Sequence, residues 1–281
     1  MASTTGKARH AQPPFVPGLE VAGTVRALGD GVTGFAVGEK VVSTSAGAGT
    51  GGYATVYIAT VGGVVSIEDS NVDPALAVAM IPNAAMAHVA LTLVAKLVEG
   101  ESVLVHGALG GLASAFPGIA RQLGASRVVG TVRSGKLEAA ANTKLPYDWI
   151  IDSAELPGVL AGERFDVIID PVGGTVRDQS SALMKPGSRL IVAGNASGDW
   201  AHAVKTNDLW LGSMTVAGFN AGAFLPSHPE AIRPGLEAAV KAIASGLCYT
   251  PVDVLPFSEA VTAHERMESR NLNDRIVLTP Q

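Results

Sequence analysis

The middle of the chain alternates between short apolar stretches and helical patterns, and this rhythm restricts the fold more than any other feature. The stretches that read as strands are Ser102–His106, Arg127–Thr131, Trp149–Asp152, Phe165–Asp170, Ser188–Ala193 and Met214–Phe219. Helical patterns cover Ala84–Val98, the segment that runs to Gln122, Gly135–Ala141 and the segment that runs to Met184. Short, continuously apolar strands are typical of a parallel sheet that helices cover on both faces. The sequence therefore predicts an α/β fold with a doubly wound parallel sheet.

The two ends of the chain have a different rhythm. Before about Ile81 the sequence is rich in Val, Gly and Thr, and its short runs predict small antiparallel strands at Val21–Leu28, Lys40–Ser43, Tyr53–Ile58 and Val64–Ile67. The tail predicts a helix at Glu230–Ser245, a strand at Val252–Leu255, a helix at Phe257–Met267 with Ser258 as its N-cap, and a strand at Arg275–Leu278. We expect a mainly-β domain over residues 1–82, a dinucleotide-binding domain over 83–222, and a connecting helix with a return to the first domain over 223–281.

Composition excludes several classes of protein. The 281 residues are enough for two domains, and a net charge of −5 without any Lys/Arg cluster argues against nucleic acid or an anionic membrane surface as a partner. We find no apolar run approaching the roughly 20 residues that span a bilayer and no signal-peptide pattern, so we expect a cytoplasmic protein. Cys248 is the single cysteine, which excludes an intrachain disulfide and a zinc site built on several thiolates. The scattered His106, His202, His228 and His264 lack the short spacings of a metal site.

One strand ends in a knot of small residues, "SVLVHGALGGLAS" at 102–114. In a doubly wound sheet the first strand turns tightly into a helix whose free N–H groups attract a pyrophosphate. The positions of the dinucleotide fingerprint G-x-G-x-x-G/A are occupied by Ala108, Gly110 and Ala113, with further glycines at 107 and 111. The pattern favours a phosphate-binding turn, and the alternative is a tight turn without a ligand.

The next strand bears on the choice of cofactor. It ends in Arg133-Ser134-Gly135-Lys136, where a protein specific for NAD places an acidic residue for the ribose 2′-hydroxyl. A cation and a hydroxyl at this place suit a 2′-phosphate instead, so the sequence favours NADP(H). The alternative is a solvated pair of charges at the start of a helix.

Small residues also follow the two later strands, at Asp170-Pro171-Val172-Gly173-Gly174 and at Ala193-Gly194-Asn195. Small residues at the carboxyl ends of parallel strands keep open the crevice in which ligands bind. Asp170 could be a functional acid, but we interpret it as a buried carboxylate that caps a turn.

Five ordered motifs carry a resemblance to a known family: "PFVPGLEVAGTV", "VLVHGALGGLAS", "FDVIIDPVGG", "LMKPGSRLIVAGNASG" and "AHERMESRNLNDRIVL". Over about Gly6 to Pro280 the chain resembles the medium-chain dehydrogenase/reductase superfamily, most closely its zinc-independent quinone oxidoreductase branch. The resemblance implies a Rossmann domain, a GroES-like substrate domain made from both ends of the chain, and a cleft between them. It also implies hydride transfer from NADPH to an activated C=C bond or a quinone, in a homodimer.

The resemblance assigns cofactor-binding roles by position. The pyrophosphate loop is Gly110, Gly111 and Leu112, the 2′-phosphate site is Arg133, Ser134 and Lys136, the crevice is Val172, Gly194 and Asn195, and the strand end near the nicotinamide is Phe219 and Asn220. Leu19 stands before Glu20 where the zinc enzymes of the superfamily carry a histidine, so we expect no metal and a structural Glu20. No catalytic residue can be assigned; Tyr53 and His88 are candidates whose alternative role is packing.

Four features depart from the family pattern. Gly6–Gly18 matches sequence that normally follows several strands, so we expect a truncated GroES-like domain with exposed edges and apolar surface. An upstream start, a natural shortening and cover by another subunit remain open explanations. Phe116-Pro117-Gly118 predicts a kinked helix, with a cost of about 3 kcal/mol for the proline and about 1 kcal/mol for the glycine. Met86 and Ser153 replace a threonine near the nicotinamide and a tyrosine near the adenosine.

Three functional hypotheses follow. The first is an NADPH-dependent reductase of an enone, an enal or a quinone, a small-molecule substrate in each case. The second is an NADPH-binding protein without redox turnover. The third is a non-redox biosynthetic enzyme that catalyses an addition or a cyclisation on the same fold.

Overall fold

The computed structural model describes residues 14–44, 51–269, 272 and 274–280, so residues 6–13 of the Gly6–Gly18 motif lie outside the described part. The strands are β1 Glu20–Thr24, β2 Lys40–Thr44, β3 Val64–Ser66, β4 Ser102–His106, β5 Arg127–Val132, β6 Trp149–Asp152, β7 Phe165–Asp170, β8 Met184–Val192, β9 Thr215–Gly218, β10 Val252–Pro256 and β11 Arg275–Thr279. The α-helices are α1 Pro74–Val89, α2 Phe116–Gln122, α3 Leu137–Ala141, α4 Leu156–Val159, α5 Thr175–Ser180, α6 Thr206–Gly212, α7 Ala221–Phe224, α8 Ile232–Ala244 and α9 Ala260–Glu268.

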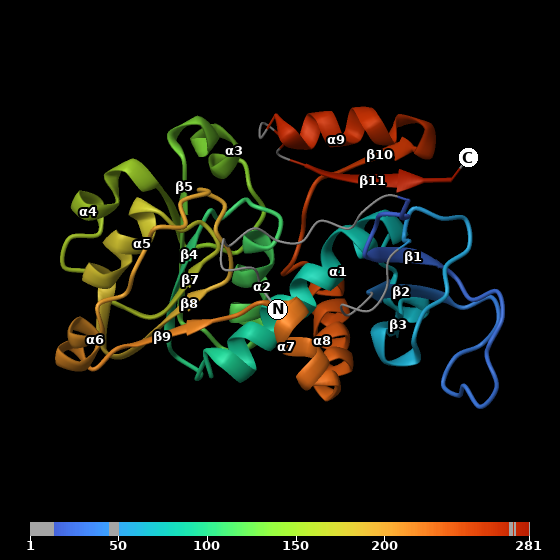
Figure 1. Ribbon diagram of the computed structural model, residues 1–281, viewed down its shortest axis with the longest axis horizontal. Helices are drawn as coiled ribbons and strands as arrows, with labels where there is room; N and C mark the ends of the chain where they lie inside the picture. Colours follow the sequence, from blue (N-terminus) through green and yellow to red (C-terminus); the bar gives the residue numbers. More distant parts are fainter. Residues whose placement is uncertain (1–13, 45–50, 270–271, 273, 281) are drawn as a thin grey trace.

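A six-stranded parallel sheet in the order β6-β5-β4-β7-β8-β9 forms the centre of one half of the molecule (Figure 1). The chain starts in the middle with β4, runs outward through β5 and β6, and returns through β7 to the other edge, which is the Rossmann strand order. The predicted α/β doubly wound sheet is confirmed. Strands β4, β6 and β7 have the bounds that the sequence predicts.

Alternate residues of these strands enter two separate cores. Val103 and Val105 of β4 pack in a cluster with residues of α1, α2 and α8, whereas Leu104 packs on the opposite face with Leu156 and Leu160. Because side chains alternate across a strand, a strand that is buried on both faces must be apolar at every position. This is the physical reason for the continuous apolar runs in the sequence.

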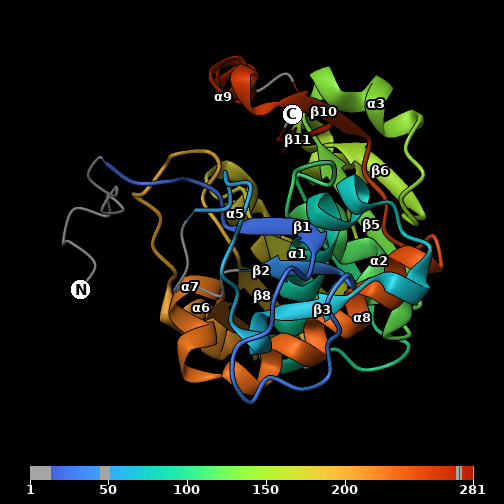
Figure 2. The same cartoon turned by 90° about the vertical axis from the view of Figure 1, so that its right-hand side faces the viewer.

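The other half of the molecule combines both ends of the chain (Figures 1 and 2). An antiparallel sheet in the order β1-β2-β3 lies beside a separate parallel pair, β10 with β11, and α9 lies against that pair. The predicted strand at Tyr53–Ile58 is wrong, since this segment is irregular. Ile58 is 93% exposed and Val56 is 56% exposed, so the β-branched residues here have no packed surface to stabilise a strand.

The expected apolar surface on this half is confirmed. Four large apolar residues are more than half exposed: Leu19 beside β1, Val37 before β2, and Val56 and Ile58 in the irregular segment. They line the same broad cleft, which is described with the site below.

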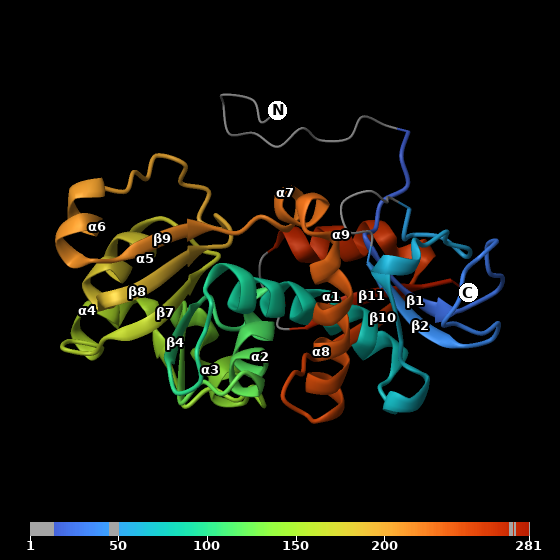
Figure 3. The same ribbon diagram turned by 90° about the horizontal axis from the view of Figure 1, so that it is seen from below.

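The prediction that no apolar run could span a bilayer is wrong for one helix. Pro74–Val94, which is α1 continued by a π-helical turn, is long and apolar enough by length and composition alone. Most of it is buried inside the protein, where α1 packs against α8 and β1, as seen in Figure 3. The core helix of a soluble protein meets the same criteria, so this feature is weak evidence for a membrane segment.

Pro117 does not lie in the interior of an α-helix, where the sequence pattern places it. A 3₁₀ turn at Ala113–Ala115 precedes α2, and Pro117 stands in the first turn of α2, where proline is well tolerated. Gly118 is required by packing, because a Cβ there would overlap the backbone carbonyl of Leu247.

Other predicted boundaries and caps also differ from the structure; for example, the helix expected at Ala84–Val98 begins at Pro74 as α1. The helix expected to reach Met184 ends with a 3₁₀ turn at Leu183, and β8 begins at Met184, four residues before the predicted Ser188. Ser258 is not an N-cap, since it lies inside a 3₁₀ turn at Phe257–Glu259 that has no side-chain cap.

Candidate functional site

The glycine-rich turn lies at the carboxyl end of β4. Gly107 has a φ of +65°, the amide of Gly110 donates to the carbonyl of Gly107 at 2.7 Å, and the amide of Ser114 donates to the carbonyl of Gly110 at 2.8 Å. The helical segment starts at Ala113, and the first amides of a helix have no acceptor within it. The turn therefore presents backbone donors at the sheet edge where dinucleotides bind.

Two neighbouring residues hold this turn in place. The Tyr147 hydroxyl donates to the carbonyl of Ala108 at 3.2 Å, and burial raises the pKa of Tyr147 well above its usual value, so it remains a donor. At Gly130 of β5 a Cβ would lie 2.7 Å from the Cβ of Ala108. The turn thus sits directly on the adjacent strand, and a side chain at Gly130 would push it away.

Arg275, the first residue of β11, is a component of this site that the sequence analysis missed. Its guanidinium lies against Gly111, where a Cβ would overlap Nη1. Burial raises the pKa of Glu20, and the charge of Arg275 partly opposes that effect, so Arg275 stands between this carboxyl group and the turn. A guanidinium beside free backbone amides is a suitable receptor for a diphosphate.

The three residues assigned to a 2′-phosphate follow β5. Arg133 and Ser134 are exposed, and Ser134 lowers the pKa of Asp152 through a side-chain hydrogen bond. Lys136 Nζ donates to the carbonyl of Leu272 at 2.8 Å. Desolvation and the charge of Arg133 lower the pKa of Lys136, while the charge of Asp274 opposes this. The C-terminal return of the chain thus touches both the turn and this neighbouring cluster.

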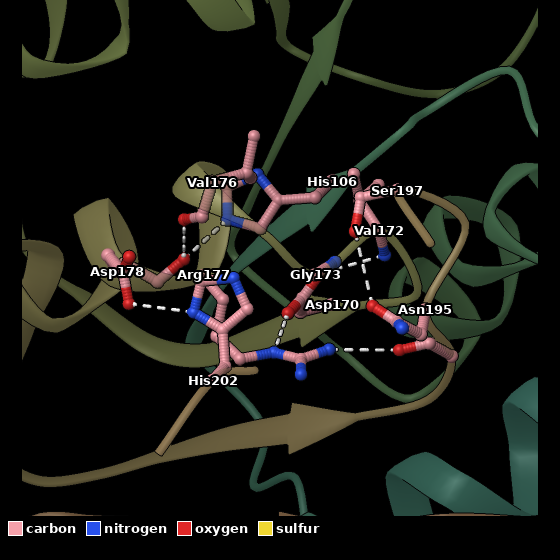
Figure 4. A network of polar contacts seen from close by, with 12 residues as sticks. His106, Asp170, Val172, Gly173, Val176, Arg177, Asp178, Asn195, Ser197 and His202 are labelled. Carbon is pink, nitrogen blue, oxygen red and sulfur yellow. Dashed lines mark hydrogen bonds and ion pairs between the residues drawn. The ribbon is translucent and has the colours of Figure 1, made fainter. Parts of the chain in front are cut away.

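The turn after β7 is organised by Asp170 (Figure 4). This fully buried carboxylate accepts from the amides of Val172 and Gly173, both at 2.8 Å, and from Arg177 Nε at 2.6 Å. Arg177 Nη2 also donates to the carbonyl of Gly194 at 2.9 Å, which ties the β7 and β8 ends together. The interpretation of Asp170 as the cap of a turn is confirmed.

The crevice residues cluster at these strand ends. Val172 lies close to the turn, since a Cβ on Gly107 would be 3.0 Å from Val172 Cγ2, and a Cβ on Gly194 would be 2.8 Å from the carbonyl of Pro171. Asn195 Oδ1 accepts from Ser197 Oγ at 3.1 Å, while Asn195 Nδ2 is buried without a partner in the described part of the protein. An orphaned amide donor at this edge can bind a ligand.

Phe219 and Asn220 follow β9. The Phe219 side chain is 5% exposed and packs edge-on against Phe224, so its ring belongs to the core. Asn220 is exposed and directly precedes α7. Only the backbone of Phe219 and the side chain of Asn220 are therefore available to a cofactor.

His106 is buried beneath the turn (Figure 4). Its Nε2 lies 2.8 Å from Ser180 Oγ and its Nδ1 lies 3.0 Å from Thr131 Oγ1. Because Ser180 Oγ donates to the carbonyl of Val176, Nε2 must carry the proton and donate to Ser180. Burial lowers the pKa of His106 to about 4, partly opposed by the charge of Asp170. His106 is a neutral core histidine rather than a metal ligand.

An open cleft of about 1750 Å³ runs from the β1-β2-β3 sheet to the glycine-rich turn. Its lining includes Leu109, Gly110, Gly111 and Arg275 at the turn, together with Glu20 and Tyr53. The Tyr53 hydroxyl lies 3.2 Å from His264 Nε2, and its ring stacks on Phe257. Burial raises the pKa of Tyr53.

The other candidate, His88, lies in α1 and does not line this cleft, and burial lowers its pKa. Of the two candidates, only Tyr53 therefore lies where a substrate could meet the turn. Among the residues that the structure describes, no group of three or more His, Cys, Asp or Glu side chains could hold a metal ion.

Comparisons with known proteins agree with this architecture. The model of the zinc-binding dehydrogenase family matches residues 123–278, and that of the alcohol dehydrogenase GroES-like domain matches residues 1–69. A 2-haloacrylate reductase from Burkholderia sp. is 29% identical over 279 residues, which are 96% of this chain and 82% of the relative. The human synaptic vesicle membrane protein VAT-1 homolog-like is 32% identical over 66% of this chain and 43% of its own length.

Solved structures give the same result. A mycobacterial quinone oxidoreductase superposes with a TM-score of 0.81 at 28% identity, over 97% of this chain and 84% of that chain. A mycobacterial relative solved in complex with NADPH has a TM-score of 0.79 at 28% identity, over 97% and 85% of the two chains. The chain belongs to the zinc-binding dehydrogenase family, in the quinone oxidoreductase-like branch of the medium-chain dehydrogenases/reductases.

Proposed function

We propose that this protein is an NADPH-dependent reductase that transfers a hydride, without zinc, to an activated C=C bond of an enone or enal, or to a quinone. The observation that carries the proposal is the glycine-rich turn with Arg275 against Gly111 and with Arg133 and Lys136 after the adjacent strand. Names of the relatives support it: one reduces 2-haloacrylate, an activated alkene, and another is a quinone oxidoreductase.

The residues present fit this cofactor. Free backbone amides and a guanidinium at Gly111 match a diphosphate, and the cations of Arg133 and Lys136 match the dianionic 2′-phosphate. The orphaned amide of Asn195 supplies a further donor at the same sheet edge. The Gly110 amide is used within the turn, where it donates to the carbonyl of Gly107, and Gly111 leaves the backbone accessible because it carries no side chain between its amide and the ligand.

Each part of the site then has a distinct task. When bound, NADPH supplies the hydride. The turn and Arg275 would hold the diphosphate, and the ends of β7 and β8, fixed by Asp170 and Arg177, would form the crevice for the rest of the cofactor. Positioning of this kind lowers the barrier, since it replaces a bimolecular encounter with a fixed geometry. Tyr53, whose pKa burial raises further above neutrality, is the hydroxyl donor in the cleft.

The proposal is tested by titrating NADPH against the protein by fluorescence and then following NADPH oxidation with 2-haloacrylates, enones, enals and quinones. Oxidation with at least one acceptor supports the proposal. Binding without oxidation of any acceptor favours a cofactor-binding protein without turnover, and the absence of binding leaves a non-redox enzyme.

The 2′-phosphate assignment is tested by substitution. Arg133→Ala and Lys136→Ala should weaken NADPH binding at least about tenfold and hardly affect NADH binding. Lys144→Ala, at a lysine that lies over the ring of Tyr249, is the control.

We also propose that the protein forms a homodimer through β9. This strand is at the edge of the parallel sheet, and an unpaired edge strand can pair with its own copy about a twofold axis. Trp210 and Leu211 in the preceding α6 are 76% and 74% exposed, which supplies apolar surface beside the edge. Light scattering after size exclusion should give a dimer for the native chain and a monomer for the double variant Trp210→Glu, Leu211→Lys. A native monomer contradicts this proposal.

A further inference from the structure

The C-terminal return of the chain reaches the candidate 2′-phosphate site from the other half of the molecule. The carbonyl of Leu272 accepts a hydrogen bond from Lys136 Nζ at 2.8 Å, although the two residues are far apart in the sequence. Three residues further on, Arg275 lies against Gly111. Leu272 and Arg275 therefore contact both anion-binding parts of the site.

Asp274 brings a negative charge into this cationic region. It is 29% exposed, and its Oδ2 lies 3.8 Å from Arg266 Nη2 in α9. Arg266 is held in turn by Asp253 of β10, whose Oδ2 is 2.7 Å from Nη1. The carboxylate of Asp274 also acts on Lys136, because it opposes the lowering of the Lys136 pKa that Arg133 and desolvation cause. Asp274 thus lies two residues after the carbonyl that binds Lys136 Nζ, and its charge acts on a lysine that is assigned to the 2′-phosphate.

The Leu272 carbonyl and the Asp274 carboxylate affect Lys136 differently. The Leu272 carbonyl is uncharged, so its bond to Lys136 Nζ orients the ammonium group without cancelling its charge. A carboxylate close to the same ammonium cancels part of its charge and repels a phosphate dianion. It has no comparable effect on the 2′-hydroxyl of NADH, which is neutral.

We propose that Asp274 is a specificity-determining residue that limits the preference of this site for NADPH over NADH, an inference that rests on the function proposed above. Asp274 opposes the charge of Lys136, one of the two cations assigned to the 2′-phosphate, and Asp274 forms an ion pair with Arg266 of α9. The C-terminal return of the chain therefore sets cofactor choice together with the strand end after β5.

Removing this charge has a predictable effect. For groups roughly 8 Å apart in a solvent-screened site, the repulsion of a dianion by one carboxylate changes a dissociation constant by up to about tenfold. We expect Asp274→Asn to tighten NADPH binding by about three- to tenfold and to leave NADH binding within about twofold of the native value. Asp274→Ser, which removes the same charge with a shorter side chain, should also tighten NADPH binding.

The test is a fluorescence titration of NADPH and NADH with the native chain, Asp274→Asn and Asp274→Ser at low salt and again at 0.5 M salt. Adenosine 2′,5′-bisphosphate and AMP serve as fragments that differ only in the 2′-phosphate. Glu265→Gln is the matched control, because it removes the same charge from exposed surface next to Arg266 without acting on the pKa of Lys136. High salt should reduce the gain in NADPH affinity, since screening weakens the repulsion.

The outcomes separate this inference from the proposed function. If the native chain binds NADPH and Asp274→Asn changes the affinities for NADPH and NADH by the same factor, or changes neither, the inference is overturned and the function stands. If Glu265→Gln tightens NADPH binding as much as Asp274→Asn does, the effect comes from the net charge of the protein and the inference is again overturned. If the native chain binds neither NADPH nor the bisphosphate, the proposed function fails and this inference fails with it.

Discussion

Gly111 shows how a missing side chain can assemble a site from distant parts of a chain. Its backbone has no Cβ, and the guanidinium of Arg275 occupies the space that one would fill. Gly111 also lines the cleft. A glycine here therefore serves two purposes, the approach of a diphosphate and the contact with β11.

We predict that Gly111→Ala weakens NADPH binding at least about tenfold, because the methyl group displaces Arg275 and covers the amides. Stability should change little, since the overlapping atom is the end of a flexible side chain. Fluorescence titration measures the first effect and urea denaturation the second. Gly158→Ala, where a Cβ meets nothing within 4 Å, is the control. Unchanged affinity in Gly111→Ala would remove this glycine from the binding site.

His106 makes the stability of the protein depend on pH. Its pKa is about 4 in the folded protein and near 6.5 when solvated, because burial disfavours the charged ring. As the pH falls below 6.5 the unfolded chain binds a proton that the folded chain does not, so stability is lost down to pH 4, by up to about 3 kcal/mol.

We predict that His106→Gln, whose amide can replace both hydrogen bonds, lacks this loss. The free energy of unfolding, measured by urea titration from pH 7.5 to 4.5, should therefore fall less steeply for the variant than for the native chain. Parallel pH profiles would show that His106 does not titrate as its burial implies.

Among the elements, α2 reverses the expectation that its own sequence suggests. The sequence Phe116-Pro117-Gly118 looks unfavourable inside a helix, yet Pro117 stands in the first turn and Gly118 lets α2 approach the carbonyl of Leu247. Local patterns give the cost of a residue in an isolated helix, whereas the boundary of the helix and its neighbours decide the actual cost.

We predict that Gly118→Ala destabilises the protein by about 1–3 kcal/mol, because the methyl group overlaps rigid backbone. Helix propensity alone predicts a gain of about 1 kcal/mol for the same change, so the two accounts differ in sign. Chemical denaturation distinguishes them, with Gly158→Ala in α4 as the helical control. A stabilised Gly118→Ala would mean that α2 does not pack this closely.

The elements that the sequence predicts well are those with a strong local signal. Continuous apolar runs place β4, β6 and β7 to the residue, because burial on both faces leaves no other pattern. Tyr53–Ile58 has the composition of a strand but not its packing, and composition alone cannot supply a partner. Arg275 was missed as a site residue because its contact with Gly111 joins positions far apart in the sequence, and its only local signal is a basic residue at the start of the last strand.

At the scale of the whole molecule, the two halves meet where the cofactor is proposed to bind. Arg275 and Leu272 reach the parallel-sheet half from the C-terminal return, and α1 packs on α8 between the halves (Figure 3). A ligand that contacts both halves stabilises the arrangement of the whole chain. The proposed site is therefore linked to global stability.

We predict that NADPH at a hundred times its dissociation constant adds about 2.7 kcal/mol to the free energy of unfolding. NADH at the same concentration should add less, because it lacks the 2′-phosphate that Arg133 and Lys136 bind. Thermal denaturation followed by circular dichroism measures both shifts, with AMP as the control ligand. Equal shifts for the two cofactors would contradict the assigned 2′-phosphate site.

The most direct test of the central claim is a crystal structure of the protein in complex with NADPH. We predict the diphosphate on the amides of Gly111 and Leu112 beside Arg275, and the 2′-phosphate between Arg133 and Lys136. NADPH bound elsewhere, or a turn that stays empty at saturating cofactor, would contradict it.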